Sequence, residues 1–225
     1  MNLTKLKQDF KNEDAYHKHV NRDLVALVNA DPLLEAHRNY IDQFQFGFGE
    51  RSFQFVWKLI CEQLPDSPSL LEIGCYKGQI LSLWKLLRPD ANVFGVTPLD
   101  DTGLGWQHEE GFYANAIKKI HDDFELEQPI LIVGKSNEVS VEGKFDCVYI
   151  DGSHQYADVL YDLETFAPKV KSGGWLVIDD CAIDMDIQSE LFPGIKEVQD
   201  AYDAWDKSDF EFWFTVVHLR VMRRK

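Results

Sequence analysis

Apolar residues recur in two different rhythms along this chain. Within the first forty residues they return at helical spacing in a mostly polar background, as in Leu24, Leu27 and Val28, which predicts short amphipathic helices. Asp31-Pro32 is typical of a helix start, because aspartate caps free backbone N–H groups and proline fits the first turn. We expect two short helices there, then an aromatic loop interrupted by glycines over residues 40–49.

From residue 52 onward, helical segments alternate with short apolar runs. We expect helices at 52–64, 80–87, 114–124, 156–170 and 195–205, and strands at 69–73, 92–96, 129–133, 145–150 and 175–179. Such alternation predicts an α/β fold in which helices cover both faces of a parallel sheet. Two closely spaced runs at 210–215 and 216–222 indicate an antiparallel pair at its edge.

The composition excludes several classes of protein. With 45% hydrophobic residues in 225, the chain can bury a full core, unlike a disordered segment. Its 38 acidic residues outnumber 23 basic ones, for a net charge of −15, which argues against a nucleic-acid partner because phosphate contacts need clustered cations.

The chain also lacks the features of an exported or membrane protein. No apolar run approaches the roughly 20 residues that cross a bilayer, and the N-terminus becomes polar too soon for a signal peptide. The four cysteines form no C-x-x-C pair, which is typical of reduced thiols. We therefore expect a cytoplasmic protein without a membrane partner. The oligomeric state stays open, a homo-oligomer included.

The first motif that carries chemistry is Glu72-Ile73-Gly74-Cys75, followed by Gly78. A strand here enters a turn whose glycines let a ligand approach the backbone, next to the free N–H groups of the following helix. The spacing differs from the Gly-x-Gly-x-x-Gly fingerprint that cradles a dinucleotide, so a ligand without a pyrophosphate fits better. An ordinary strand-to-helix turn remains the structural alternative.

Two further motifs place acids at strand ends. Asp151 ends one apolar strand and is followed by His154, while Asp179 and Asp180 end another. Ligands of parallel sheets bind beyond the carboxyl ends of the strands, and three carboxylates suit the oxygen preference of Mg²⁺. The alternatives are that Asp151 caps the next helix and that the other two acids are solvated.

The ordered set Glu72-x-Gly74, Asp151-x-x-His154 and Gly173-Gly174 leading to Asp179-Asp180 resembles the class I S-adenosylmethionine-dependent methyltransferases. Within that class it is most similar to the metal-dependent O-methyltransferases, related to catechol O-methyltransferase, and especially to the macrolide-sugar and cephalosporin-tailoring branch. The resemblance covers about residues 53–222. It implies a Rossmann-like, doubly wound sheet of seven strands in the order 3-2-1-4-5-7-6, one of them antiparallel, in a domain of residues 53–225. Residues 1–52 would form a helical extension and lid.

The resemblance also implies residue roles at the cofactor. Glu72, Gly74, Cys75 and Gly78 match the loop that holds the methionine end of S-adenosylmethionine, and Asp151 borders the same site. Ser136 matches the residue at the adenine edge. Thr97 stands where the family usually has the acid that binds the ribose, so either Thr97 or Asp100 would make that contact.

The implied reaction is the Mg²⁺-dependent transfer of a methyl group to a hydroxyl of a small molecule, such as a sugar or other natural product. Asp151, Asp179 and Asp180 match the metal triad. His154, whose ordinary pKa lies near neutral pH, would take the hydroxyl proton with Asp151 beside it. His108, His121 and His218 are expected to be structural or exposed. Residues 40–51 and 181–195 would flank the acceptor. A metal-independent methyltransferase and a non-catalytic cofactor-binding subunit are the alternatives.

Overall fold

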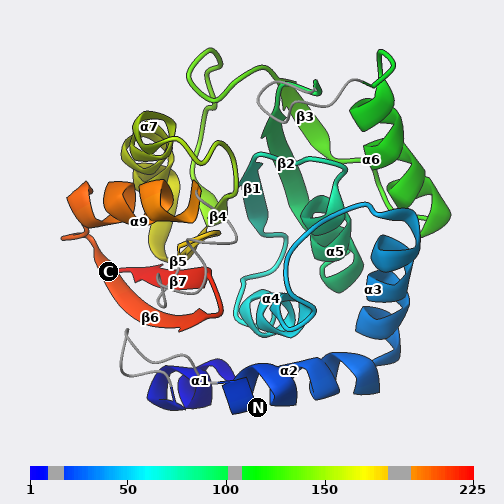
Figure 1. Ribbon diagram of the computed structural model, residues 1–225, viewed down its shortest axis with the longest axis horizontal. Coiled ribbons are helices and arrows are strands. Elements are labelled where there is room, and N and C mark those ends of the chain that lie inside the picture. Colours follow the sequence, from blue (N-terminus) through cyan, green and yellow to red (C-terminus); the bar gives the residue numbers. More distant parts are fainter. Residues whose placement is uncertain (10–17, 101–107, 182–193) are drawn as a thin grey trace.

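The computed structural model describes residues 1–9, 18–100, 108–181 and 194–225 (Figure 1). Its helices are α1 (Leu3–Asp9), α2 (Lys18–Ala30), α3 (Pro32–Phe44), α4 (Phe53–Cys61), α5 (Gln79–Leu87), α6 (Phe112–Asp123), α7 (Tyr156–Phe166), the 3-10 turn η1 (Ala167–Lys169) and α9 (Gly194–Ala204). Its strands are β1 (Ser69–Ile73), β2 (Asn92–Thr97), β3 (Ile130–Val133), β4 (Phe145–Ile150), β5 (Val170–Ile178), β6 (Phe210–Val216) and β7 (Leu219–Arg224).

The sheet confirms the predicted order, β3-β2-β1-β4-β5-β7-β6. The five strands from β1 to β5 pair in parallel, whereas β7 is antiparallel to both of its neighbours. The reversed strand therefore lies inside the sheet, and β6 forms the edge. The antiparallel pairing of β6 and β7 follows from the length of the loop between them. Only Val217 and His218 separate the two strands, and such a short connection allows only an antiparallel hairpin.

Two hydrophobic cores cover the two faces of the sheet. One joins α1, α2, α4 and α5 to the sheet, with Trp57 and Trp84 at its centre; the other joins α7 and α9 to the opposite face, around Phe166. Figure 1 shows these helices on either side of the strands. Within the described residues, no helix is long and apolar enough to span a membrane.

The N-terminal region contains more helix than its sequence indicates. Three helices precede α4 instead of two, and α3 continues through residues 40–44, where we expected a loop. Asp31 caps α3 as predicted, accepting hydrogen bonds from the backbone N–H groups of Leu33 (3.0 Å) and Leu34 (3.3 Å). Tyr40 and Phe44 extend the helix because their rings pack together, 4.6 Å apart, so aromatic residues that suggested a loop line one helical face.

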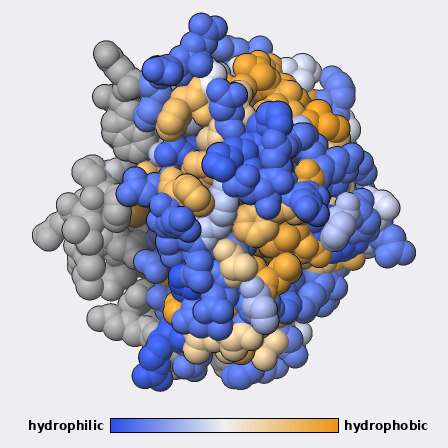
Figure 2. All heavy atoms as spheres, turned by 90° about the vertical axis from the view of Figure 1, so that its right-hand side faces the viewer, coloured by the Kyte–Doolittle hydropathy of each residue, from blue (hydrophilic) through white to orange (hydrophobic). Residues whose placement is uncertain are grey.

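Apolar side chains also reach the surface on the side of α3 and α6, where Figure 2 shows them gathered among polar ones. Phe44 of α3 and two residues of the edge strand β3, Ile130 and Val133, are exposed. Scattered exposed apolar groups are normal for soluble proteins, and β3 exposes them because it is the last strand on its side of the sheet.

We predict that Trp57→Ala lowers the free energy of unfolding by about 3–5 kcal/mol, because it empties a fully buried site. The Trp57 ring contacts Trp84 and Tyr149 edge to face, with centroids 5.2 and 5.0 Å away. Its indole N–H has no hydrogen-bond partner in the described structure, so Trp57→Phe, as a control, should cost much less. Urea denaturation measures both; a loss below about 1 kcal/mol for Trp57→Ala would contradict this packing role.

Candidate active site

The predicted acids meet at the carboxyl edge of the sheet because β1, β4 and β5 end in register. Ile73 pairs with Ile150, and Ile150 with Ile178. The hydrogen-bond ladder then continues one residue further: the N–H of Asp151 donates to the Ile73 carbonyl at 2.8 Å, and that of Asp179 to the Ile150 carbonyl at 3.0 Å. Asp151 and Asp179 are therefore neighbours on adjacent strand ends, as the sequence predicted.

Among the described residues, the side chains form two overlapping groups whose potential ligand atoms lie within 4.8 Å of one another. One is Asp151, His154 and Asp180; the other is Asp179, Asp180 and His218. Asp180 belongs to both groups: its Oδ2 lies 2.8 Å from Nε2 of His154, and its Oδ1 lies 3.4 Å from Nδ1 of His218. The structure thus brings all three predicted carboxylates to one place, but it sets Asp151 and Asp179 in different groups.

The Tyr149 hydroxyl contacts one acid of each group. Its hydroxyl lies 2.5 Å from Oδ2 of Asp179 and 3.1 Å from Oδ2 of Asp151. Burial and the neighbouring carboxylates raise the pKa of this phenol well above its ordinary value, so it remains a hydrogen-bond donor. Sequence reasoning missed Tyr149, although strand alternation offered a signal, since residues two apart share one face.

The electrostatics of the cluster reflect crowded negative charge. Burial, followed by the charges of Asp179 and Asp180, raises the pKa of Asp151 well above its usual range. Burial would also raise the pKa of Asp179, but its hydrogen bonds from His218 and Tyr149 lower it. The hydrogen bond with Asp180 raises the pKa of His154. Three carboxylates face two imidazoles here, a donor set that a divalent cation fits.

The glycine turn after β1 borders this cluster. Gly74 has a φ of +89°, and a Cβ atom on it would lie 2.0 Å from the carbonyl oxygen of Asp151, so any side chain would push the two strand ends apart. Gly78, at φ +84°, precedes the first turn of α5. Only glycine lets the turn and the acids approach this closely.

Glu72 is the buried acid of that turn. It is 2% exposed, and its Oε2 has no hydrogen-bond partner in the part of the chain that the structure describes. Burial, and then the charge of nearby Asp179, raises the pKa of Glu72 well above its ordinary value. An unsatisfied buried acceptor is costly, which marks Glu72 as a position for a donor group of a ligand.

The other predicted cofactor residues occupy the same edge. Cys75 is buried, and its thiol faces the carbonyls of Glu72 and Val96 at 3.7 and 3.6 Å, so it presents no side chain to a ligand. The Thr97 hydroxyl accepts from the Leu99 N–H at 3.3 Å, and Asp100 is exposed. Ser136 hydrogen-bonds the buried Asp162 of α7. The roles of these four at a cofactor stay predictions.

His218, which the sequence indicated to be structural or exposed, joins the carboxylate cluster, because its Nδ1 lies 2.7 Å from Oδ1 of Asp179. It sits in the turn between β6 and β7, about 40 residues beyond the acids, and no local motif marks it. By contrast, His121 fits that expectation, with its Nδ1 2.8 Å from the carbonyl of Ile117 on its own helix, and His108 is exposed. Residues 182–193, most of the second predicted acceptor flank, lie outside the described residues.

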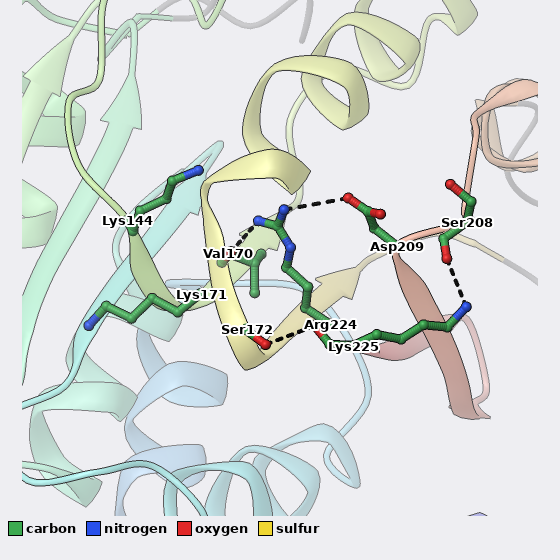
Figure 3. A pocket seen from close by; sticks show the side chains of 8 residues that line it. All are labelled: Lys144, Val170, Lys171, Ser172, Ser208, Asp209, Arg224 and Lys225. Atoms are coloured by element: carbon green, nitrogen blue, oxygen red, sulfur yellow. Dashed lines mark hydrogen bonds and ion pairs between the residues drawn. The ribbon is translucent and has the colours of Figure 1, made fainter.

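A basic hollow lies at the opposite edge of the sheet (Figure 3). It is lined by Lys144, Val170, Lys171, Ser172, Ser208, Asp209, Arg224 and Lys225. Its cations already have partners: Lys144 donates to the Pro168 carbonyl at 2.6 Å, and Lys225 to the Ser208 carbonyl at 2.7 Å. These side chains stabilise loops at the start of β4 and β5, away from the carboxylate cluster.

We predict that Asp162 makes stability depend on pH. Burial, partly offset by the hydrogen bond to Ser136, raises its pKa from 3.8 to about 6. Because the folded state binds this proton more tightly, stability is highest below pH 4 for this group and falls by up to about 3 kcal/mol as pH rises past 6.

Unfolding of Asp162→Asn, measured from pH 4.5 to 7.5, should lack this contribution, so the variant gains stability relative to wild type as pH rises. Ser136→Ala, a comparison that keeps the acid but removes its hydrogen bond, should make the loss above pH 6 larger. A difference between wild type and Asp162→Asn that stays constant with pH would show that the carboxyl group ionises without cost.

Residues 71–181 match the family model described as "Methyltransferase domain". The uncharacterized protein R132 of Acanthamoeba polyphaga mimivirus is 26% identical over 186 residues, covering 77% of this chain and 78% of that protein. Among solved structures, a Staphylococcus aureus protein proposed to be a caffeoyl-CoA O-methyltransferase superposes with a TM-score of 0.66, at 16% identity over 91% of this chain and 98% of that one.

Two further solved structures carry a bound ligand of the same kind. The SAH-bound methyltransferase PaMTH1 of Podospora anserina has a TM-score of 0.64, at 14% identity, covering 94% of this chain and 97% of its own. The O-methyltransferase of Bacillus cereus, in complex with SAH, has a TM-score of 0.58, at 14% identity, covering 87% and 91%. The match of residues 71–181 to a methyltransferase domain and the strand order β3-β2-β1-β4-β5-β7-β6 together show that the chain has the Rossmann-like fold of methyltransferases.

Proposed function

We propose that this protein is a divalent-cation-dependent O-methyltransferase that moves a methyl group from S-adenosylmethionine to a hydroxyl group of a small molecule, such as a sugar or other natural product. The observation that carries the proposal is the meeting of Asp151, His154 and Asp180 within 4.8 Å beside the Gly74 turn. This group supplies acids for a cation and a base for a hydroxyl proton at one point.

The donor of the methyl group would bind along the turns after β1, β2 and β3. Glu72, with its buried and unpartnered oxygen, suits the positively charged methionine end, and Gly74 and Gly78 leave room for it. Thr97 or Asp100 would contact the ribose, and Ser136 the adenine. The SAH bound to PaMTH1 and to the Bacillus cereus enzyme, which share this fold, supports the choice of donor.

His154 is the residue placed to take the proton from the acceptor. Its imidazole is 46% exposed, with Nε2 against Oδ2 of Asp180, so it can contact both the cluster and an incoming molecule. A hydroxyl oxygen is a weak nucleophile until it loses its proton. A divalent cation held by Asp151, Asp179 and Asp180 would lower the pKa of that hydroxyl and fix its orientation. The oxygen then attacks the methyl carbon as the carbon–sulfur bond breaks.

The acceptor would lie against the segment between α3 and α4. Phe48 is 69% exposed, and its ring centroid lies 5.2 Å from that of Tyr76 in the glycine turn. Phe44 and Phe46 instead pack against Tyr40, at 4.6 and 5.6 Å. Lys77 ties the segment down by donating to the Gln45 carbonyl at 3.0 Å. Phe48 is therefore the aromatic residue we assign to stacking on a sugar or phenolic ring, and residues 1–52 remain our proposed lid.

A metal-independent methyltransferase is the second candidate, because each acid after β5 already has an imidazole partner. Asp179 pairs with His218, and Asp180 with His154. In that case the histidines alone would balance the acids, and the two ion pairs would only position His154.

We predict that cofactor binding and turnover respond differently to chelation. Isothermal calorimetry should detect S-adenosylhomocysteine binding with and without EDTA. Methyl transfer to a panel of catechols and hexoses should require added Mg²⁺ or Mn²⁺, and Asp180→Asn should reduce it at least about 100-fold. Turnover that persists in EDTA and in Asp180→Asn would support the metal-independent candidate. No binding of S-adenosylhomocysteine at millimolar concentration would contradict both.

We predict that His154→Gln lowers kcat by at least about 100-fold while it leaves the affinity for S-adenosylhomocysteine unchanged, because the amide cannot take a proton. Steady-state kinetics and calorimetry test the two parts. His108→Gln is the matched control, since His108 is exposed and stacks on Phe112, 4.0 Å between centroids. Equal kcat in His154→Gln and wild type would remove the proposed base.

A further inference from the structure

His218 is the residue of the cluster that the family resemblance does not assign. Its Nδ1 faces carboxylates of two successive residues, 2.7 Å from Oδ1 of Asp179 and 3.4 Å from Oδ1 of Asp180. An ordinary ion pair needs only one of these acids. Atoms that bind one metal ion at about 2.1 Å lie roughly 3.0–3.4 Å from one another around it. The 3.4 Å separation falls in this range, and the 2.7 Å separation is a hydrogen-bond length only slightly below it.

The backbone holds the imidazole in this position. The N–H of Cys181, directly after the two acids, donates to the His218 carbonyl at 2.9 Å, which fixes the β6–β7 turn against the end of β5. Asp180 and Val217 both adopt positive φ, +52° and +57°, which costs energy for residues other than glycine. Such strain persists only where the surrounding structure imposes it.

Packing restricts the ring further. Phe53, at the start of α4, lies edge to face against the His218 imidazole with centroids 5.0 Å apart, and the side chain is 17% exposed. A side chain restricted in this way is positioned before any ligand arrives, which is the arrangement that metal sites need.

The charge around His218 favours a cation. Asp179 and Asp180 contact it directly, Asp151 is joined to Asp179 through Tyr149, and the buried Glu72 has an oxygen without a partner among the described residues. Four carboxyl groups and two imidazoles therefore meet at one edge of the sheet, which is a donor set for a cation.

We propose that His218 is a ligand of the cation centre, together with Asp179 and Asp180, so that the centre is a mixed imidazole–carboxylate site. This inference rests on the proposed function and names its metal class. Imidazole binds first-row transition ions such as Mn²⁺, Co²⁺ and Ni²⁺ better than Mg²⁺, which prefers oxygen ligands alone. The protein therefore selects a transition ion over Mg²⁺ through His218.

The first test is selectivity. Calorimetric titration of Co²⁺ and of Mg²⁺ into the full chain should show that His218→Gln weakens Co²⁺ binding at least about tenfold more than Mg²⁺ binding. His218→Asp, which offers oxygen in place of nitrogen, should restore Mg²⁺ binding more than Co²⁺ binding. His108→Gln should change neither. A uniform loss of affinity for both ions would show that His218 only orients Asp179, and would overturn the inference.

The second test observes the bond itself. Pulsed EPR of bound Mn²⁺ reports the nitrogen of a coordinated imidazole. In His154→Gln, which removes the other imidazole of the cluster, the ¹⁴N coupling should remain; in the double variant His154→Gln/His218→Gln it should vanish. Bound Mn²⁺ without ¹⁴N coupling in His154→Gln would overturn the inference and leave the proposed function intact. S-adenosylhomocysteine binding without any cation binding would overturn both this inference and the metal dependence.

Discussion

Negative charge crowded at the carboxyl edge of the sheet is the constraint on which this site depends. Asp151, Asp179 and Asp180 come from adjacent strand ends, and like charges this close disfavour the ionised form of each other. The protein offsets this repulsion with Tyr149 below the acids, with His154 beside them and with His218 opposite. A side-chain donor therefore meets each of the three carboxylates.

The fold holds that cluster in place through contacts that leave no room for larger side chains. Gly74 lets the end of β1 approach Asp151, and the Trp57 and Trp84 rings pack against Tyr149 from one core. Core packing and site geometry are thus coupled through Tyr149, because its ring packs against the two tryptophans and its hydroxyl contacts two of the acids. A change of volume in that core would therefore displace Tyr149 and, through it, the carboxylates that it contacts.

The relatives show how far a fold can be kept while its sequence changes. Solved structures at 14–16% identity superpose over nine tenths of this chain or nearly so. A shared overall arrangement of helices and strands accounts for this likeness, and it does not require the same residues. The chemistry of this chain therefore has to be argued from its own side chains.

Apart from the start of β5, which lies at Val170 and not at residue 175, the sequence by itself determined the strands, their order through a recognisable motif set, and the place where the acids meet. It did so because apolar runs, glycines and strand-end acids act locally: Gly74, Asp151 and Asp179 each mark the end of a strand, and parallel strands end at one edge. The sequence also predicted the helix cap at Asp31, because capping is likewise a local interaction.

Only the tertiary structure decided which side chains face one another across that edge. His218 lies far along the chain from Asp179, Tyr149 is hidden in an apolar strand, and Cys75 turns its thiol inward. Residues 40–44 continue α3 with Tyr40 packed against Phe124, a ring that lies far along the chain. Long-range packing sets these contacts, and a linear pattern does not contain the distances between residues that fold together from separate elements.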